Sequence, residues 1–413
     1  MIKIKVSSFL VLLVLFSTQI VLAQNWPSWR GPNQDGTSSE VNLPLKWDSV
    51  TNVQWKTKVP GLGYSSPVVW EDKLFLFTAL TETQERVLLC YDVKNGNLLW
   101  QKTVLTAPLE DKHKDNSYAS GTPATDGKLV YISFLDGKDA VVAAYDYSGN
   151  RVWIQRAGTF YSGWGYSCSP RLYNDMVIIN GNSPGKEPFM AALNKSDGKI
   201  IWKVAHTKPA NNFSTPIIKD IAGKTQMIFL GNQEIASYNP NDGSLNWTVE
   251  GPASDYCSSP VYNEKHDLVI VSSAWPKRVL VAIKADGQGD VTNSHVVWRS
   301  PEGGVYVPSP ITIGDYLITT MTNGKVHCMD VKTGKVLWIE ELGPQYSSPV
   351  LANNLIFMPN DEGVVTVFQP GPEFKMIAKN AIGERMNASP AISNGKIFLR
   401  GEQHLYCIAE SKK

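Results

Sequence analysis

One charged side chain stands where its counterparts in a repeating pattern are apolar. Eight Ser-Pro or Thr-Pro steps occur along the chain, and the residue after each proline is Val, Ala or Ile except once, where it is Arg171. A lone inward guanidinium needs an acidic or carbonyl partner, or it binds an anion. The sequence therefore predicts Arg171 as the anion-facing group of a ligand site. A structural salt bridge to another repeat is the alternative.

Aromatic side chains are the second candidate feature. One stands within five residues before each proline except the last, where Met386 takes its place: Tyr64, Tyr118, Tyr166, Phe213, Tyr256, Tyr306 and Tyr346. Phenolic rings around an opening suit a planar or sugar-like ligand. Packing between repeats is the alternative for a feature found in nearly every repeat.

Polar residues on the same loops complete a predicted ligand site at one mouth of a central channel. Its candidate side chains are Arg171, Trp164, Tyr166, Tyr64, Tyr118, Asn212, Asp255, Tyr256, Tyr306, Tyr346, Arg385 and Asn387. Eight strands converging on one mouth bring loops from every repeat into one small, concave volume, which is where ligands bind.

Neither catalytic residues nor a metal site are predicted. The six histidines show no metal-ligand spacing, and the acidic segment 286–290 lacks the distal Glu of a calcium loop. No G-x-S-x-G, phosphate-cradling loop or dinucleotide fingerprint occurs. The long connection 106–121 carries His113, Lys114 and Asp115, which either reach a ligand or belong to a solvated charged loop.

The elements that position these residues follow from the repeat itself. The eight prolines recur every 39 to 56 residues: Pro67, Pro123, Pro170, Pro216, Pro260, Pro310, Pro349 and Pro390. Most intervals contain four apolar runs of strand length separated by turns, and the fourth run usually ends in Trp. Four antiparallel strands per repeat of this size are typical of a propeller blade. The predicted fold is all-β: an eight-bladed β-propeller of four-stranded antiparallel blades.

The two ends of the chain are expected to close the ring. The last repeat lacks its Trp strand, and an unassigned Trp strand around Trp55 precedes the first repeat. We therefore predict that the N-terminal strand completes the C-terminal blade, which removes the exposed edges of an open array.

Three segments are expected along the chain: a signal peptide at 1–23, an N-terminal arm at 24–50, and the propeller at 51–413. The first has a basic start, a short apolar core and a small-residue cleavage site. We expect a soluble exported protein, periplasmic or extracellular and monomeric, with no membrane span. The formal net charge of +1, without a basic stripe, argues against nucleic-acid partners.

The cysteines and the arm each carry one expectation. Three of the five cysteines fall at strand positions where other repeats have small residues, so we predict buried free thiols and no disulfide.

Trp26 and Trp29 of the arm are costly to leave in water. They are expected to dock on the propeller or cap one face, with a partner-binding arm as the alternative.

The repeat Ser-Pro…Ala/Cys-x-Asp/Asn…Gly-Lys-x-x-Trp resembles the PQQ-like β-propeller repeat of quinoprotein alcohol dehydrogenases and of the outer-membrane assembly factor BamB. The stretch NWPSWRGPNQDGTS looks like the WPxWRGP leader of secreted PQQ-like repeat proteins. The resemblance implies the propeller fold. The chain departs from the dehydrogenases because it has no Cys-Cys pair and no C-x-x-C-H haem motif, and no calcium constellation is recognisable in it.

We accordingly expect an exported, non-catalytic binding or scaffold protein whose partner is a protein, a peptide or a saccharide at the channel mouth. No cofactor is expected. One alternative is an oxidoreductase that uses a sugar or PQQ, the latter with Ca²⁺. The other alternative is a BamB-like role in envelope protein assembly.

Overall fold

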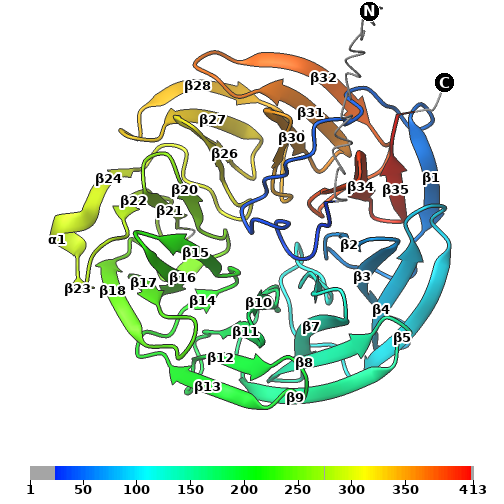
Figure 1. Ribbon diagram of the computed structural model, residues 1–413, viewed down its shortest axis with the longest axis horizontal. Coiled ribbons are helices and arrows are strands. Elements are labelled where there is room, and N and C mark those ends of the chain that lie inside the picture. The colour runs from blue at the N-terminus through cyan, green and yellow to red at the C-terminus, as the bar shows by residue number, and fades with distance from the viewer. Residues whose placement is uncertain (1–23, 274, 411–413) are drawn as a thin grey trace, which may run out of the picture.

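The computed structural model describes residues 24–273 and 275–410, so the predicted signal peptide lies outside the described residues. Eight blades, each with four antiparallel strands, stand around a central axis, as Figure 1 shows, and the predicted eight-bladed β-propeller is confirmed. The one described helix is α1 (Thr292–His295). None of the described helices is long and apolar enough to cross a membrane.

Each blade is built from four strands that follow one another outward from the axis. Blades 1 to 4 consist of β2 (Val68–Trp70), β3 (Lys73–Leu80), β4 (Glu85–Asp92) and β5 (Leu98–Thr106); β6 (Ala124–Thr125), β7 (Leu129–Asp136), β8 (Asp139–Asp146) and β9 (Arg151–Thr159); β10 (Arg171–Tyr173), β11 (Met176–Gly181), β12 (Phe189–Asn194) and β13 (Ile200–Ala205); and β15 (Ile217–Ile221), β16 (Lys224–Gly231), β17 (Glu234–Tyr238) and β18 (Leu245–Glu250).

The remaining blades repeat this order. Blades 5 to 8 consist of β20 (Val261–Asn263), β21 (Leu268–Ser272), β22 (Leu280–Lys284) and β24 (Val296–Ser300); β25 (Ile311–Ile313), β26 (Tyr316–Thr320), β27 (Lys325–Asp330) and β28 (Val336–Glu341); β29 (Val350–Ala352), β30 (Leu355–Pro359), β31 (Val364–Gln369) and β32 (Lys375–Ala381); and β33 (Ala391–Ser393), β34 (Lys396–Arg400), β35 (His404–Ile408) and β1 (Val53–Lys58). Outside this scheme, β14 (Asn211–Asn212) pairs with β19 (Asp255–Tyr256), and β23 (Gly289–Asp290) adds to blade 4.

Burial within a blade follows from its neighbours. The second and third strands, such as β3 and β4, are buried along their length because blades pack on both faces. Outer strands such as β28 alternate between half-buried and exposed residues, since water reaches one side of them. The apolar core therefore lies between blades, around the channel.

The tryptophan of the repeat ties each outer strand to the next blade. In six blades its indole Nε1 donates to a carbonyl of the following blade: Trp55 to Val93 (3.0 Å), Trp100 to Tyr147 (2.9 Å), Trp153 to Lys195 (2.8 Å), Trp202 to Pro240 (3.2 Å), Trp298 to Val331 (2.9 Å) and Trp338 to Gly371 (3.0 Å). The turn glycine of the next blade lies against the ring. A Cβ on Gly198, whose φ is +73°, would meet Trp153 at 2.5 Å.

The hydroxyls of the Ser/Thr-Pro steps form a closed ring of hydrogen bonds around the channel, here called the hydroxyl belt. Each residue's backbone N–H donates to the hydroxyl of the next blade: Ser66 to Thr122 (2.9 Å), Thr122 to Ser169 (2.9 Å), Ser169 to Thr215 (3.1 Å), Thr215 to Ser259 (3.2 Å), Ser259 to Ser309 (2.9 Å), Ser309 to Ser348 (2.8 Å), Ser348 to Ser389 (2.9 Å) and Ser389 to Ser66 (3.0 Å). The repeat therefore positions all eight blades at one level of the channel.

The predicted ring closure is confirmed. Strand β1 pairs antiparallel with β35, with Trp55 opposite Cys407, and completes blade 8. All five cysteines are free thiols in this structure, four of them buried and Cys257 half-buried.

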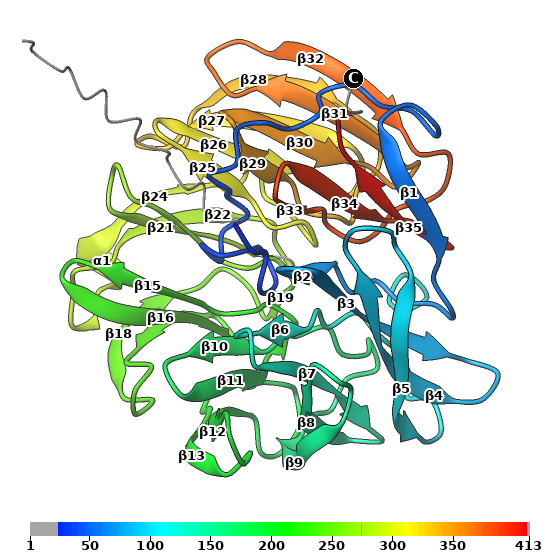
Figure 2. The ribbon, with the colours of Figure 1, turned by 45° about the vertical axis from the view of Figure 1, so that its right-hand side comes forward.

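The first part of the N-terminal arm lies at the centre of the ring, where Figures 1 and 2 show it as the dark blue segment beside the inner strands, and the chain then runs outward to β1. Trp26 is buried and forms a β-bridge with Val69 of blade 1. Two blades away around the ring, the Ser38 N–H donates to the carbonyl of Leu351 in blade 7 at 2.8 Å. The expectation that the arm docks on the propeller is confirmed.

Candidate functional site

A cavity of about 220 Å³, here called the channel pocket, lies at the channel mouth that carries the loops preceding the Ser/Thr-Pro steps. It is lined by Trp29, Tyr64, Ser66, His113, Asp115, Asn116, Ser120, Trp164, Ser167, Ser169, Phe213, Thr215, Asp255, Cys257, Ser259, Tyr306, Val307, Tyr346, Ser348, Asn387 and Ser389. Apolar rings and polar groups converge there, which is the composition of a small-ligand site.

Half of the predicted site residues meet in this pocket, because their loops converge on the axis. They are Tyr64, Trp164, Asp255, Tyr306, Tyr346 and Asn387. Trp164 is 48% exposed, so its indole is available to a ligand.

The other half lie elsewhere. Tyr166 and Tyr256 are buried between blades, with Tyr166 edge-on to Phe160 at 5.0 Å, and Tyr118 packs beside the Lys112 ammonium. Packing between repeats accounts for these three rings. The side-chain amide of Asn212 donates to the Leu230 carbonyl and accepts from the Ser214 N–H, so both of its polar atoms are already hydrogen-bonded. Arg385 is exposed and outside the lining.

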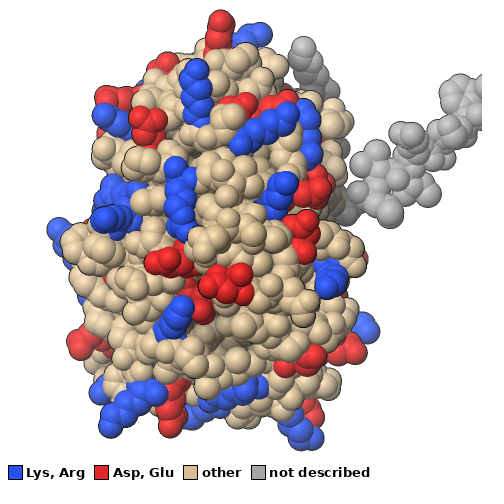
Figure 3. All heavy atoms as spheres, turned by 90° about the vertical axis from the view of Figure 1, so that its left-hand side faces the viewer, with Lys and Arg blue, Asp and Glu red and all other residues tan. Residues whose placement is uncertain are grey.

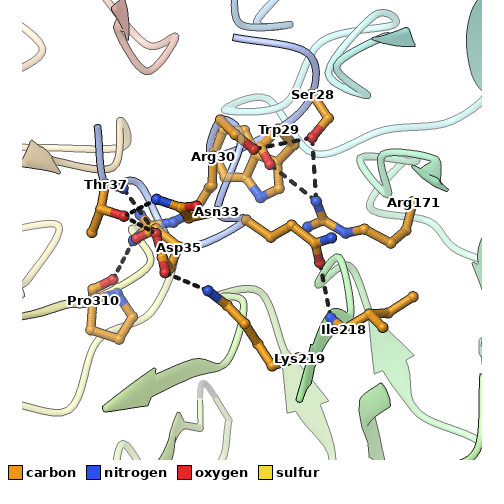
Figure 4. A network of polar contacts seen from close by, with 12 residues as sticks. Ser28, Trp29, Arg30, Asn33, Asp35, Thr37, Arg171, Ile218, Lys219 and Pro310 are labelled. Carbon is orange, nitrogen blue, oxygen red and sulfur yellow. Dashed lines mark hydrogen bonds and ion pairs between the residues drawn. The ribbon is translucent and has the colours of Figure 1, made fainter. Parts of the chain in front are cut away.

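Arg171 is also outside the lining. Figure 4 shows it beside Ser28 and Trp29 of the arm. It is 1% exposed, and its Nε donates to the carbonyl of Pro216 at 2.9 Å. Its Nη1 lies 3.4 Å from Ser28 Oγ and 3.3 Å from the carbonyl oxygen of Trp29. The guanidinium thus holds the arm through neutral oxygens, which are the carbonyl kind of partner that the sequence allowed and not the salt bridge offered as the alternative. Burial lowers the pKa of Arg171 to about 9.

Trp29 forms the pocket's floor, a role that the sequence did not reveal. It is the arm residue that lines the pocket, and its Nε1 donates to Ser259 Oγ of the hydroxyl belt at 3.3 Å. Trp26, three residues earlier, is 1% exposed, whereas Trp29 is half-buried. The two tryptophans therefore differ in role: Trp26 anchors the arm, and Trp29 faces the cavity.

The long connection between blades 1 and 2 reaches across the mouth. Asp115 Oδ2 accepts a hydrogen bond from the Tyr346 hydroxyl of blade 7 at 3.2 Å. On the other side, the ring of His113 lies 5.1 Å from that of Trp164, and Asn116 Nδ2 donates to the Trp164 carbonyl at 2.7 Å. The unusual length of this connection was what marked it in the sequence as a candidate functional loop. In the structure the connection contacts loops that are far apart in the chain.

The pocket is acidic rather than basic. The described residues that line it include the carboxylates Asp115 and Asp255 but neither Lys nor Arg. Just behind it, burial raises the pKa of Asp361 to about 6, although the Tyr346 N–H and the Arg385 charge oppose the shift. Figure 3 shows acidic and basic side chains interspersed on one outer side of the propeller. Negative charge in the pocket disfavours an anionic ligand and favours a neutral or cationic one.

Asn387 is the pocket's unpaired polar group. Its amide Nδ2 and Oδ1 are both shielded from solvent, and neither has a hydrogen-bond partner among the described residues. A buried amide without partners costs about 1–3 kcal/mol. Because Asn387 lines the pocket, a rotation of its side chain would turn this shielded donor and acceptor toward a ligand that carries both.

The residues present do not fit a quinone cofactor. PQQ carries several carboxylates, which need cationic partners, and the lining described above offers two carboxylates instead. Within residues 24–273 and 275–410, no group of three or more His, Cys, Asp and Glu side chains is placed to hold a metal ion. Cys257 has its pKa raised by burial to about 12, which is opposite to the shift of a reactive thiol.

Comparisons with known proteins agree with the fold. A family model described as outer membrane protein assembly factor BamB matches residues 83–340. BamB of Yersinia pestis is 20% identical over 297 residues, 68% of this chain and 72% of that protein. BamB of Burkholderia pseudomallei is 31% identical over 107 residues, which span 25% of this chain and 28% of that protein.

The solved structure of an enzyme also shares the architecture. The europium-containing methanol dehydrogenase superposes with a TM-score of 0.66 at 11% identity, covering 94% of this chain and 98% of that one. At this identity the likeness shows the fold alone, because one propeller fold supports many functions.

Proposed function

Because the chain belongs to the family described as outer membrane protein assembly factor BamB, we propose that it is a non-catalytic exported binding protein whose channel pocket holds a saccharide. The unpaired amide of Asn387 is the observation that carries this proposal. A sugar hydroxyl both donates and accepts, so one hydroxyl pair satisfies both amide atoms.

The rest of the lining supports a saccharide over a peptide. Trp29, Tyr64 and Trp164 offer flat apolar faces. The belt hydroxyls that line the pocket each accept a backbone N–H and keep a proton to donate. The volume is below the roughly 300–1,000 Å³ of drug-sized ligand sites. It suits one ring-sized group at the end of a chain better than an extended peptide strand.

The test is binding of glucose, N-acetylglucosamine, glucosamine and glucuronate, measured by saturation-transfer NMR and calorimetry. At least one of the neutral or cationic sugars should bind, and glucuronate should bind most weakly because of Asp115 and Asp255. No binding of any of the four sugars to the wild-type protein would refute the proposal.

The Asn387→Leu variant gives the test a second signature. Leucine keeps the side-chain volume and removes the unpaired amide, so thermal stability should rise while sugar affinity falls at least tenfold. Tyr166→Phe is the matched control, since its hydroxyl is also unpaired and buried but lies outside the lining. It should leave affinity unchanged. Equal affinities of wild type and Asn387→Leu would contradict the assigned role of Asn387.

A BamB-like role in envelope protein assembly is the second candidate, and the family match over residues 83–340 favours it. Loss of the protein should then lower the level of outer-membrane proteins in the cell that makes it. If Asn387→Leu restores those levels as well as wild type does, assembly does not use the channel pocket. If the Asn387→Leu protein is stable but fails to restore the outer-membrane protein levels, the channel pocket is used both for sugar binding and for assembly.

A further inference from the structure

The arm is held at several points of the ring, and among its described residues Trp29 is the one that lines the cavity. The backbone of Trp26 exchanges two hydrogen bonds with Val69, at 2.8 and 2.9 Å. Asp35 pairs with Lys219 of blade 4 at 2.9 Å, and the Arg30 guanidinium donates to the carbonyl of Pro310 at 2.6 Å. These anchors fix the level at which the Trp29 indole meets the hydroxyl belt.

The turn that follows Trp29 requires its particular residues. Arg30 and Gly31 both have positive φ, of 64° and 75°. A Cβ on Gly31 would meet the Trp26 ring at 2.7 Å, so glycine is needed for the arm to close over its own anchor. A larger residue at position 31 therefore displaces the arm, and it does so without a substitution at any residue that lines the pocket.

Docking of the arm also has an opposing electrostatic contribution. It buries Arg30 beside Arg171, with 3% and 1% of the two residues exposed. Their like charges repel one another, and little water is present to screen them. Arg30 Nε and Arg171 Nη2 have no hydrogen-bond partner among the described residues. The docked arm is thus less stable than its contacts alone suggest, which leaves its position open to influence from the pocket above it.

We propose that Trp29 is a ligand-contacting residue and that docking of the arm and binding of the sugar strengthen one another. The inference rests on the proposed function, and it makes residues 24–38 part of the site. A sugar ring that stacks on the Trp29 indole binds the docked arm and not the released one, so each event stabilises the other by the same free energy.

The experiment uses the full mature chain and the tightest-binding sugar of the four-sugar panel. Trp29→Ala should weaken binding at least tenfold, and Trp29→Phe, which keeps a flat ring, should weaken it less. Gly31→Val should weaken binding to a similar degree, because it displaces the arm. Trp100→Phe, an outer-strand change remote from the lining, is the control and should leave affinity unchanged.

Hydrogen exchange provides the reciprocal measurement. Saturating sugar should slow exchange of the Trp26 and Ser38 amides, which are hydrogen-bonded only while the arm is docked. Wild-type affinity in Trp29→Ala, or unchanged arm exchange with sugar bound, would overturn the inference and leave the proposed function standing. Absence of sugar binding to the wild-type protein would overturn both.

Discussion

Buried guanidinium groups determine how the arm and the propeller fit together at the residue scale. Arg171 and Arg30 donate to carbonyl and hydroxyl oxygens across the channel, and burial lowers the pKa of Arg30 to about 10. Both remain protonated near neutral pH. Since a guanidinium presents five donors in a fixed plane, one side chain can join the arm to two blades.

Replacing Arg171 by Met is expected to destabilise the protein by about 2–4 kcal/mol, since charge-assisted hydrogen bonds are lost and the Pro216 carbonyl is left buried without a donor. Urea denaturation measures this difference. Arg385→Met is the control, because Arg385 is exposed, and its effect should stay within about 0.5 kcal/mol. Equal midpoints for the two variants would contradict the anchoring role of Arg171.

Asp361 should make stability depend on pH. Burial raises its pKa from 3.8 to about 6, with Asp115 and Glu362 adding to the shift and Arg385 opposing it. Between pH 4 and 6 the folded protein holds a proton that the unfolded chain has largely lost, so this contribution to stability falls as pH rises through the folded pKa and levels off about one pH unit above it. In Asp361→Asn the decline should be smaller. Unfolding free energies of both proteins at pH 4, 5, 6 and 7 test this, and parallel curves would refute it.

The hydroxyl belt explains the Ser/Thr-Pro repeat at the scale of the strand. Proline has no N–H to donate, and the residue before it is restricted to extended conformations. The serine or threonine at that position directs its own N–H to the next blade and accepts from the previous one, as Thr215 does between Ser169 and Ser259. Each step is therefore a joint between inner strands.

Thr215→Val should cost about 1–3 kcal/mol, because it keeps the shape of the side chain and leaves the Ser169 N–H buried without an acceptor. Thr215→Ser keeps the hydroxyl and should be close to neutral. Chemical denaturation of the pair isolates the hydroxyl from the packing. The belt has no energetic role if valine is tolerated as well as serine.

The blades were predictable from the sequence because their signals are local and repeated. Ser/Thr-Pro steps mark every blade, turn glycines and Trp strands mark most of them, and β1 was recognisable as an unassigned strand. The pocket was predictable only where a residue's register places it at the axis, as for Tyr64 and Tyr306. Arg171 was placed on the correct strand, but its partners come from the arm, and no local pattern reveals a contact between positions 143 residues apart.

At the scale of the whole molecule, the ring of blades is closed by strands from the two ends of the chain. A propeller without closure exposes the edges of its first and last blades, and here β1 and β35, from opposite ends of the chain, share one sheet. Trp55 extends this joint into blade 1, because its indole donates to Val93 and lies against Gly96 of the next turn. The seam between blade 8 and blade 1 thus uses the same contact as the seams within the chain.

Trp55→Ala is therefore expected to destabilise the entire ring by about 3–5 kcal/mol, the usual cost of truncating a large buried ring. Lys58→Ala on the same strand is exposed and should change stability by less than about 0.5 kcal/mol. If the ring unfolds as one unit, the urea midpoint of Trp55→Ala falls while the slope of the transition is kept, since the same surface is exposed on unfolding. A separate early transition would show instead that blade 8 opens alone, and that the seam stabilises one blade and not the ring.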